Sequence, residues 1–184
     1  AKARPSQPSM QVLLWGVFGV AAYLGYGVNK VVPIVMAGTA AITSAWQWAL
    51  LAGTVGFFAY AEGYKGFQKG FSPRVVSRAW ALAERGAGPF WHKLLAPAFC
   101  IGYFHGTKKR VISSWCVTTG VFLLVVGVKR LANPYRAIID AGVIVGLAWG
   151  VVSALVILAK CLASGKAPVF DPALPAGSPY SSSH

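Results

Sequence analysis

Histidines are the residues of this chain that could most readily hold a metal-centred cofactor. His92 and His105 flank one short apolar segment, and the third histidine, His184, ends the sequence. An imidazole on an apolar segment can ligate the metal of a haem or a chlorophyll. His92 and His105 are therefore candidate pigment or haem ligands, although hydrogen bonding at a membrane edge is the simpler interpretation of both.

The acidic and nucleophilic residues show no spacing typical of a catalytic or metal site. The four acids are Glu62, Glu84, Asp140 and Asp171, and the three cysteines are Cys100, Cys116 and Cys161. They form no C-x-x-C pair, no HExxH motif and no triad-like grouping, and the glycines form no P-loop or GxGxxG motif. The sequence therefore predicts a protein that is not an enzyme and binds no metal through these residues, with cysteines that act as small buried hydrophobic residues.

An ion or proton pathway would need ionisable groups deep in the bilayer. Glu62 is expected at a membrane boundary in a local ion pair with Lys65, and Asp140 at the start of the last span, one helical turn from Arg136. None of the acids is therefore expected at depth. A small transporter or channel remains the alternative function of a different class.

The clearest positive motif is a line of small residues near the C-terminus. Gly142, Gly146, Gly150 and Ala154 recur every four residues, so they share one face of a helix. Small residues let a second helix approach closely within a membrane, where dispersion replaces the missing hydrophobic force. The line predicts tight packing, either within the bundle or against another subunit.

A second pattern lies in the segment EGYKGFQKGF, where aromatic and basic residues recur at spacings of three or four. Its members are Tyr60, Tyr64, Lys65, Phe67, Lys69 and Phe71. An aromatic face beside a cationic face is typical of a contact with anionic lipid or with a partner at the membrane boundary. An ordinary interfacial anchor is the simpler interpretation.

Composition indicates a membrane protein. The 184 residues are 56% hydrophobic and 11% charged, and the apolar residues come in long blocks. A net charge of +13 would suggest nucleic acid in a soluble protein, but most basic residues here border apolar blocks. That placement suits anionic headgroups and the positive-inside rule, so no nucleic-acid partner is expected.

The apolar blocks predict an all-α polytopic bundle of four transmembrane helices. The spans are expected at about 10–28, 44–60, 111–128 and 137–159, with a shallow connection over 33–43 and an exit from the membrane over 61–71. Ser72 as N-cap and Pro73 at the first helical position would start an amphipathic helix that reaches about Glu84. It would lie in the membrane interface or, equally, pack as a surface helix on the protein. Residues 89–105 are too short to span with ease, so five spans remain the alternative.

The chain divides into a polar basic segment 1–9, a membrane domain 10–163 and a tail 164–184 rich in Pro, Ser and Gly. The tail is expected to be an extended arm available to lie on a neighbouring protein. The positive-inside rule favours four spans, with both ends and the segment from Lys65 to Arg110 on the stromal, matrix or cytoplasmic side.

Two stretches, AEGYKGFQKGFSPRVVSRA and LAPAFCIGYFHGTKKRVISSW, resemble those of a small multi-pass membrane family of bacteria and algae. The resemblance would cover Gln11 to Lys160. It implies an old membrane module and no catalytic residues, because the family has no known activity.

These features predict a non-catalytic accessory or scaffold subunit of an organellar membrane complex. Its expected partners are membrane lipids, including anionic lipids, and other integral membrane subunits. The thylakoid, in a photosystem or light-harvesting assembly, is favoured over the mitochondrial inner membrane, and chlorophyll, carotenoid or bound lipid are the cofactors to consider. A membrane enzyme completed by another chain is a third alternative.

Overall fold

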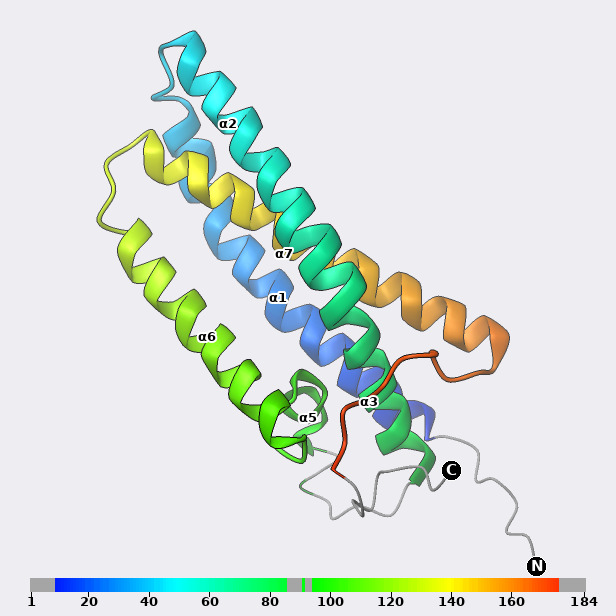
Figure 1. Ribbon diagram of the computed structural model, residues 1–184. Helices are drawn as coiled ribbons and strands as arrows, with labels where there is room; N and C mark the ends of the chain where they lie inside the picture. The colour runs from blue at the N-terminus through cyan, green and yellow to red at the C-terminus, as the bar shows by residue number, and fades with distance from the viewer. Residues whose placement is uncertain (1–8, 86–90, 92–93, 176–184) are drawn as a thin grey trace, which may run out of the picture.

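The computed structural model describes residues 9–85, 91 and 94–175, and every element in these residues is a helix (Figure 1). Among these described residues, three helices are long and apolar enough to cross a membrane: α1 (Met10–Thr39), α6 (Lys108–Val128) and α7 (Tyr135–Ser164). The prediction of a membrane helical bundle is therefore supported, whereas its four spans are not confirmed.

Helix α1 is longer than the sequence indicated. It continues without a break to Thr39 with Pro33 inside it, so the shallow connection expected over 33–43 shrinks to a turn after the helix. A proline removes one backbone hydrogen bond, and membrane helices tolerate it where neighbouring groups satisfy the freed carbonyl. The 30 residues extend about 45 Å, which exceeds the hydrocarbon thickness of about 30 Å.

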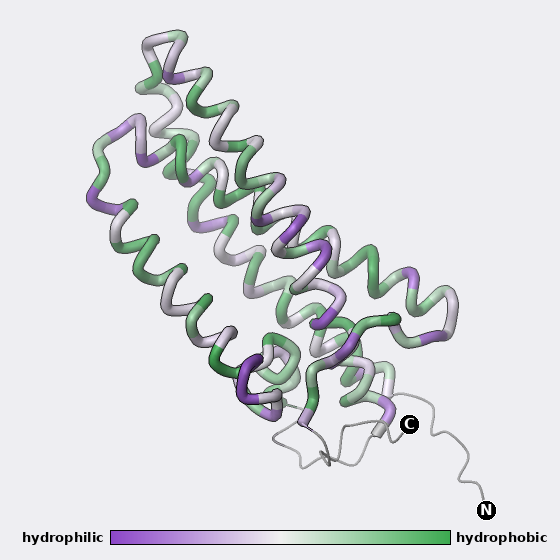
Figure 2. The backbone as a smooth tube through the Cα atoms, in the orientation of Figure 1, coloured by the Kyte–Doolittle hydropathy of each residue, from purple (hydrophilic) through white to green (hydrophobic). Residues whose placement is uncertain are grey.

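The second expected span is part of a continuous rod rather than a separate helix. The rod consists of α2 (Ala45–Phe58), a π-helical segment η1 (Ala59–Phe71) and α3 (Ser72–Arg85). Residues 61–71, where an exit from the membrane was expected, continue the helix, because i→i+5 hydrogen bonds carry the chain through them. Figure 2 shows hydrophilic residues midway along this rod, where η1 lies.

The short helix α5 (Ala96–Ile101) occupies the segment whose spanning was uncertain. Six residues rise only about 9 Å, too little to cross a bilayer. Ala96, Phe99 and Cys100 are fully buried against α1 and α3. These described residues therefore form a buried plug at one end of the bundle, which argues against five spans.

Helix α7 is the centre of the bundle and packs along both α1 and the rod. It runs parallel to the rod and antiparallel to α1, whose Gly38 approaches Ala137 near the start of α7. Helix α6 stands apart from the other helices over most of its length (Figure 1). Among its described contacts, those near its own start, to the segment that follows α5, are the main attachments.

The buried core lies at one end of the bundle. It joins the first turns of α1, the whole of α3, α5 and the last turns of α7; its largest members are Leu13, Val17, Val75, Val76, Trp80, Phe99 and Leu158. Of the two alternatives that the sequence left open for this helix, packing on the protein holds, and the apolar face of α3 is covered by protein. Because α2 has no buried residue, the opposite half of the molecule presents apolar side chains outward, as a bilayer requires.

The tail, as far as it is described (up to Pro175), lies on the surface of the helices and does not extend away from them. The backbone N–H of Thr107 donates to the Ala173 carbonyl at 3.1 Å, and Leu174 packs against the core. The part of the predicted arm that the structure describes therefore lies on its own chain. Residues 176–184, with His184, lie outside the described residues.

Candidate functional site

The line of small residues on α7 packs against the rod of the same chain. A Cβ built on Gly142 would lie 2.7 Å from Cδ2 of Phe58, and one built on Gly150 would lie 2.5 Å from Cδ1 of Phe67. Any side chain there would overlap an aromatic ring, so glycine is required for this approach. Ala154, the last member of the line, is buried in the core. The partner that the sequence could not identify is therefore internal.

The rod also contributes a glycine, Gly63, to its contact with α7. Gly63 receives the Trp149 side chain, whose Nε1 donates to Oε1 of Gln68 at 2.8 Å. Further along, the hydroxyl of Ser72 lies 2.7 Å from that of Ser153 and donates to the Gly150 carbonyl at 3.2 Å. Sequence analysis gave Ser72 the role of a helix cap; it is instead a buried hydrogen-bonding residue inside the rod.

The π-helical segment explains how the two helices stay in register. Contacts on the rod occur at Phe58, Glu62, Phe67 and Ser72, while those on α7 occur at Gly142, Gly146, Gly150 and Ser153. The spacing of five within η1 matches its i→i+5 hydrogen bonds. Helical segments of this kind are common at functional sites, where they turn side chains onto a chosen face.

Glu62 lies on the contact between η1 and α7. Its Oε2 would lie 2.9 Å from a Cβ built on Gly146, so the carboxyl group faces α7. Gly146 stands in the middle third of a 30-residue helix, and not at its boundary. The ion pair expected with Lys65 is absent, since the only ion pair among the described residues joins Arg136 to Asp140 at 3.6 Å.

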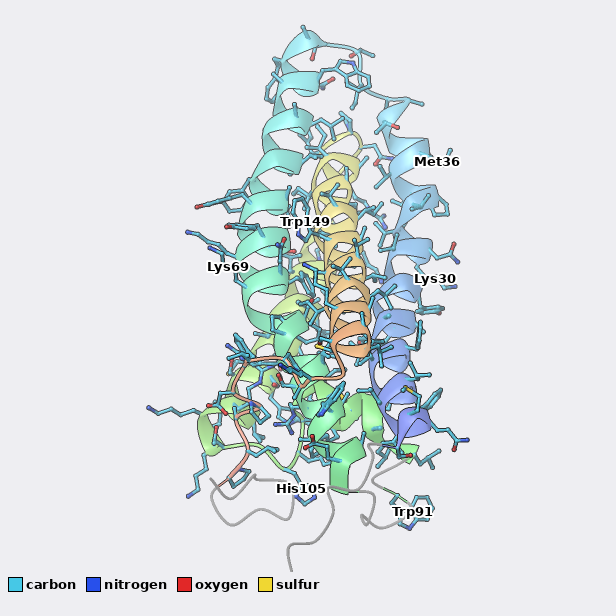
Figure 3. The ribbon with its side chains drawn as sticks, turned by 90° about the vertical axis from the view of Figure 1, so that its right-hand side faces the viewer. Lys30, Met36, Lys69, Trp91, His105 and Trp149 are labelled. Atoms are coloured by element: carbon cyan, nitrogen blue, oxygen red, sulfur yellow. The ribbon has the colours of Figure 1, made fainter. Side chains whose placement is uncertain are left out.

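The other side of η1 carries a ladder of tyrosines and lysines. Lys65 lies over the ring of Tyr60 at 4.9 Å, Lys69 lies over that of Tyr64 at 4.4 Å, and the two tyrosine rings stack at 6.0 Å. Figure 3 shows Lys69 pointing away from α7. Four residues of the predicted contact face are thus available to lipid or a partner.

The remaining two members of that face, Phe67 and Phe71, turn inward. Their rings meet edge to face at 5.4 Å, with Phe67 against Gly150 and Phe71 against the core. They are packing residues, and the predicted contact face is therefore narrower than the sequence pattern.

Arg78 is a central residue of α3 that the sequence patterns did not single out. It is fully buried, and its guanidinium donates to the carbonyls of Phe99 at 2.7 Å, Pro172 at 2.9 Å, Phe104 at 3.0 Å and His105 at 3.2 Å. It also lies 4.4 Å from the centre of the Phe99 ring. Burial lowers the pKa of Arg78 to about 10, so the group stays charged at neutral pH.

This arrangement makes Arg78 the clamp that joins three parts of the chain. Its acceptors come from α5, from the loop before α6 and from the tail. Among the described residues, no carboxylate forms an ion pair with Arg78. The dipoles of the carbonyl groups therefore stabilise its buried charge. One signal in the sequence could have indicated that Arg78 is buried: it stands between the apolar pairs Val75-Val76 and Ala79-Trp80.

The histidines and cysteines form no site within the described part of the chain. His105 is exposed at the end of the bundle with a φ of 51°, and His92 lies outside the described residues (Figure 3). Cys100 and Cys161 are buried and Cys116 is exposed; burial raises the pKa of the Cys100 thiol to about 12. In residues 9–85, 91 and 94–175, no three potential metal ligands gather.

Comparison with protein-family models, with curated proteins and with solved structures found no match. The resemblance to a bacterial and algal membrane family therefore stays a prediction.

Proposed function

We propose that this protein is a non-catalytic accessory subunit that holds a larger membrane complex together. The observation that carries the proposal is the isolation of α6. Only 11% of its most apolar stretch is buried, and large side chains such as Trp115, Phe122 and Leu123 are exposed along it. Lipid alone can cover such a helix, but a bundle normally packs each of its helices on at least one face, and a neighbouring subunit would complete this packing.

The exposed side of α6 offers the geometry of a helix-docking face. Cys116, Gly120 and Gly127 are spaced by four and seven residues, so they share one face of the helix. A Cβ built on Gly120 or Gly127 would meet no atom within 4 Å, and Cys116 is exposed. The glycine line of α7 is already covered by the rod. We therefore assign the face of α6 that carries Cys116, Gly120 and Gly127 to the contact with another integral membrane subunit.

The experiment that tests this role compares two glycines that are equally open. Gly120→Leu would prevent close approach at α6, whereas Gly53→Leu changes an open glycine on α2. We expect Gly120→Leu to lower the yield of intact complex on native gels after mild extraction, with unchanged thermal unfolding of the isolated chain. Normal assembly of Gly120→Leu, or a wild-type chain that is monomeric in every mild detergent, would remove the proposal.

We assign the complex to a thylakoid photosystem or light-harvesting assembly, with the mitochondrial inner membrane as the alternative organelle. The support is the exposed aromatic surface of α1, α2 and α6, against which pigments could pack. The absorption spectrum of the purified complex discriminates between them, because chlorophyll or carotenoid bands and haem bands are distinct.

Glu62 favours a second function, an ion or proton pathway along the contact between η1 and α7. An ionisable residue on a helix–helix contact inside a membrane bundle is a functional candidate, and within the described residues no ion pair or hydrogen bond to its carboxylate is found. The two functions differ in a simple observable, since a pathway gives flux across a sealed vesicle and a scaffold does not.

A further inference from the structure

A basic hollow of about 540 Å³ lies where α3, the start of α6 and the tail meet. Its charged lining residues are Arg74, Lys109, Arg110 and Asp171, beside Ser113 and Phe170. None of these residues belongs to the contact between η1 and α7 or to the docking face of α6. We propose that this hollow binds the phosphate group of an anionic lipid.

The charges of the hollow do not cancel. Three cationic side chains face one carboxylate, and Oδ1 of Asp171 accepts the backbone N–H of Ala173 at 2.8 Å. Within the described part of the chain, Asp171 forms no ion pair with Arg74, Lys109 or Arg110. An excess of positive charge therefore remains that a phosphate would neutralise.

Hydrogen-bond donors around the hollow are also left without acceptors. Nη2 of Arg110 donates to the Ile101 carbonyl at 3.2 Å, but its buried Nε has no acceptor among the described residues. Within the described residues, the guanidinium of Arg74 lies over the Phe170 ring, at 5.5 Å, and has no hydrogen-bond acceptor. Helix α6 begins here without a side-chain cap from Thr107, so its first amides also point outward with the positive end of the helix dipole.

The position along α6 selects a lipid rather than a free anion. The apolar stretch of α6 begins at Val111, directly after Lys109 and Arg110, so the hollow lies at headgroup depth. Exposed Ile112 and Trp115 follow on the same helix and would contact the acyl chains. A lipid can thus use both the cationic hollow and the apolar helix, whereas inorganic phosphate can use only the first.

The test is a titration of the full chain in mild detergent with phosphatidylglycerol, with bound lipid counted by native mass spectrometry. Phosphatidylcholine serves as the neutral lipid and inorganic phosphate as the free anion. The double variant Arg74→Gln/Lys109→Gln should bind phosphatidylglycerol roughly tenfold to thirtyfold more weakly. Lys129→Gln/Arg130→Gln, which removes the same charge from the other end of α6, should bind it normally.

Asp171→Asn provides a second variant that keeps every cation, and it should strengthen phosphatidylglycerol binding. Equal binding of the two lipids, equal loss in both double variants, or no gain in Asp171→Asn would overturn the proposal. Inorganic phosphate that binds as tightly as the lipid would assign the hollow to a free anion instead. The proposal does not depend on the docking role of α6, because these variants leave Cys116 and Gly120 in place.

Discussion

The carboxyl group of Glu62 lies against Gly146, on the contact between η1 and α7. A Cβ on Gly146 would come within 2.9 Å of Oε2 of Glu62, whereas at Gly150 the nearest atom is part of the Phe67 ring. A carboxyl group at the end of a flexible side chain can move aside, but a packed ring cannot. The two glycines of one line therefore tolerate substitution differently.

We predict that Gly150→Ala destabilises the folded chain more than Gly146→Ala does. The added methyl group at Gly150 overlaps the Phe67 ring, and overpacking of this kind typically costs about 1–3 kcal/mol. Thermal unfolding in one detergent measures the difference. Gly120→Ala, at an open position of α6, is the control and should leave the unfolding temperature unchanged or slightly raised. Equal changes of the unfolding temperature in Gly150→Ala and Gly120→Ala would contradict the tight contact between Gly150 and the Phe67 ring.

Replacement of Glu62 by Gln separates the two proposed functions. Gln is nearly isosteric, so the packing against Gly146 should persist and the yield of complex should stay at the wild-type level. As a scaffold, the wild-type protein in sealed vesicles should pass protons no faster than empty vesicles, as read with an internal pH dye. Flux that is present in the wild type and lost in Glu62→Gln would establish the pathway instead.

Arg78→Met should loosen the tail. Methionine fills a similar volume but cannot donate the hydrogen bonds that Arg78 gives to the carbonyls of Phe99, Phe104 and Pro172, and a hydrogen bond from a charged group contributes about 1.5–3 kcal/mol. We expect a loss of stability of about 3 kcal/mol or more and faster chymotrypsin cleavage after Phe170. Arg130→Met, which alters an exposed arginine, is the control and should be cleaved at the wild-type rate.

Cysteine labelling can decide whether the rod lies within the bilayer. Lys109 precedes the apolar stretch of α6, while Lys69 lies two residues beyond Phe67, which contacts the middle of α7. In a Cys116→Ser background, a water-soluble maleimide should therefore modify Lys109→Cys quickly from one side and Lys69→Cys slowly from either side. Equally fast labelling at both positions would place η1 outside the hydrocarbon region.

The sequence by itself determined the class of molecule. Long apolar blocks with few charges can be stable only in a membrane, and in lipid such blocks must satisfy their own backbone groups as helices. The sequence also places Arg136 and Asp140 one helical turn apart, and they form an ion pair because neighbours at i and i+4 meet on any α-helix. These features depend on local geometry alone.

Only the tertiary structure decided where the polar residues lie. The spacing of Tyr60 to Phe71 predicts one face, but π-helical hydrogen bonds change the number of residues per turn and divide that face between α7 and the outside. Arg78 is buried because its acceptors come from segments that are distant in sequence, up to Pro172. The partner of the glycine line was equally open in the sequence, since a small residue shows that something approaches closely and does not show which helix it is.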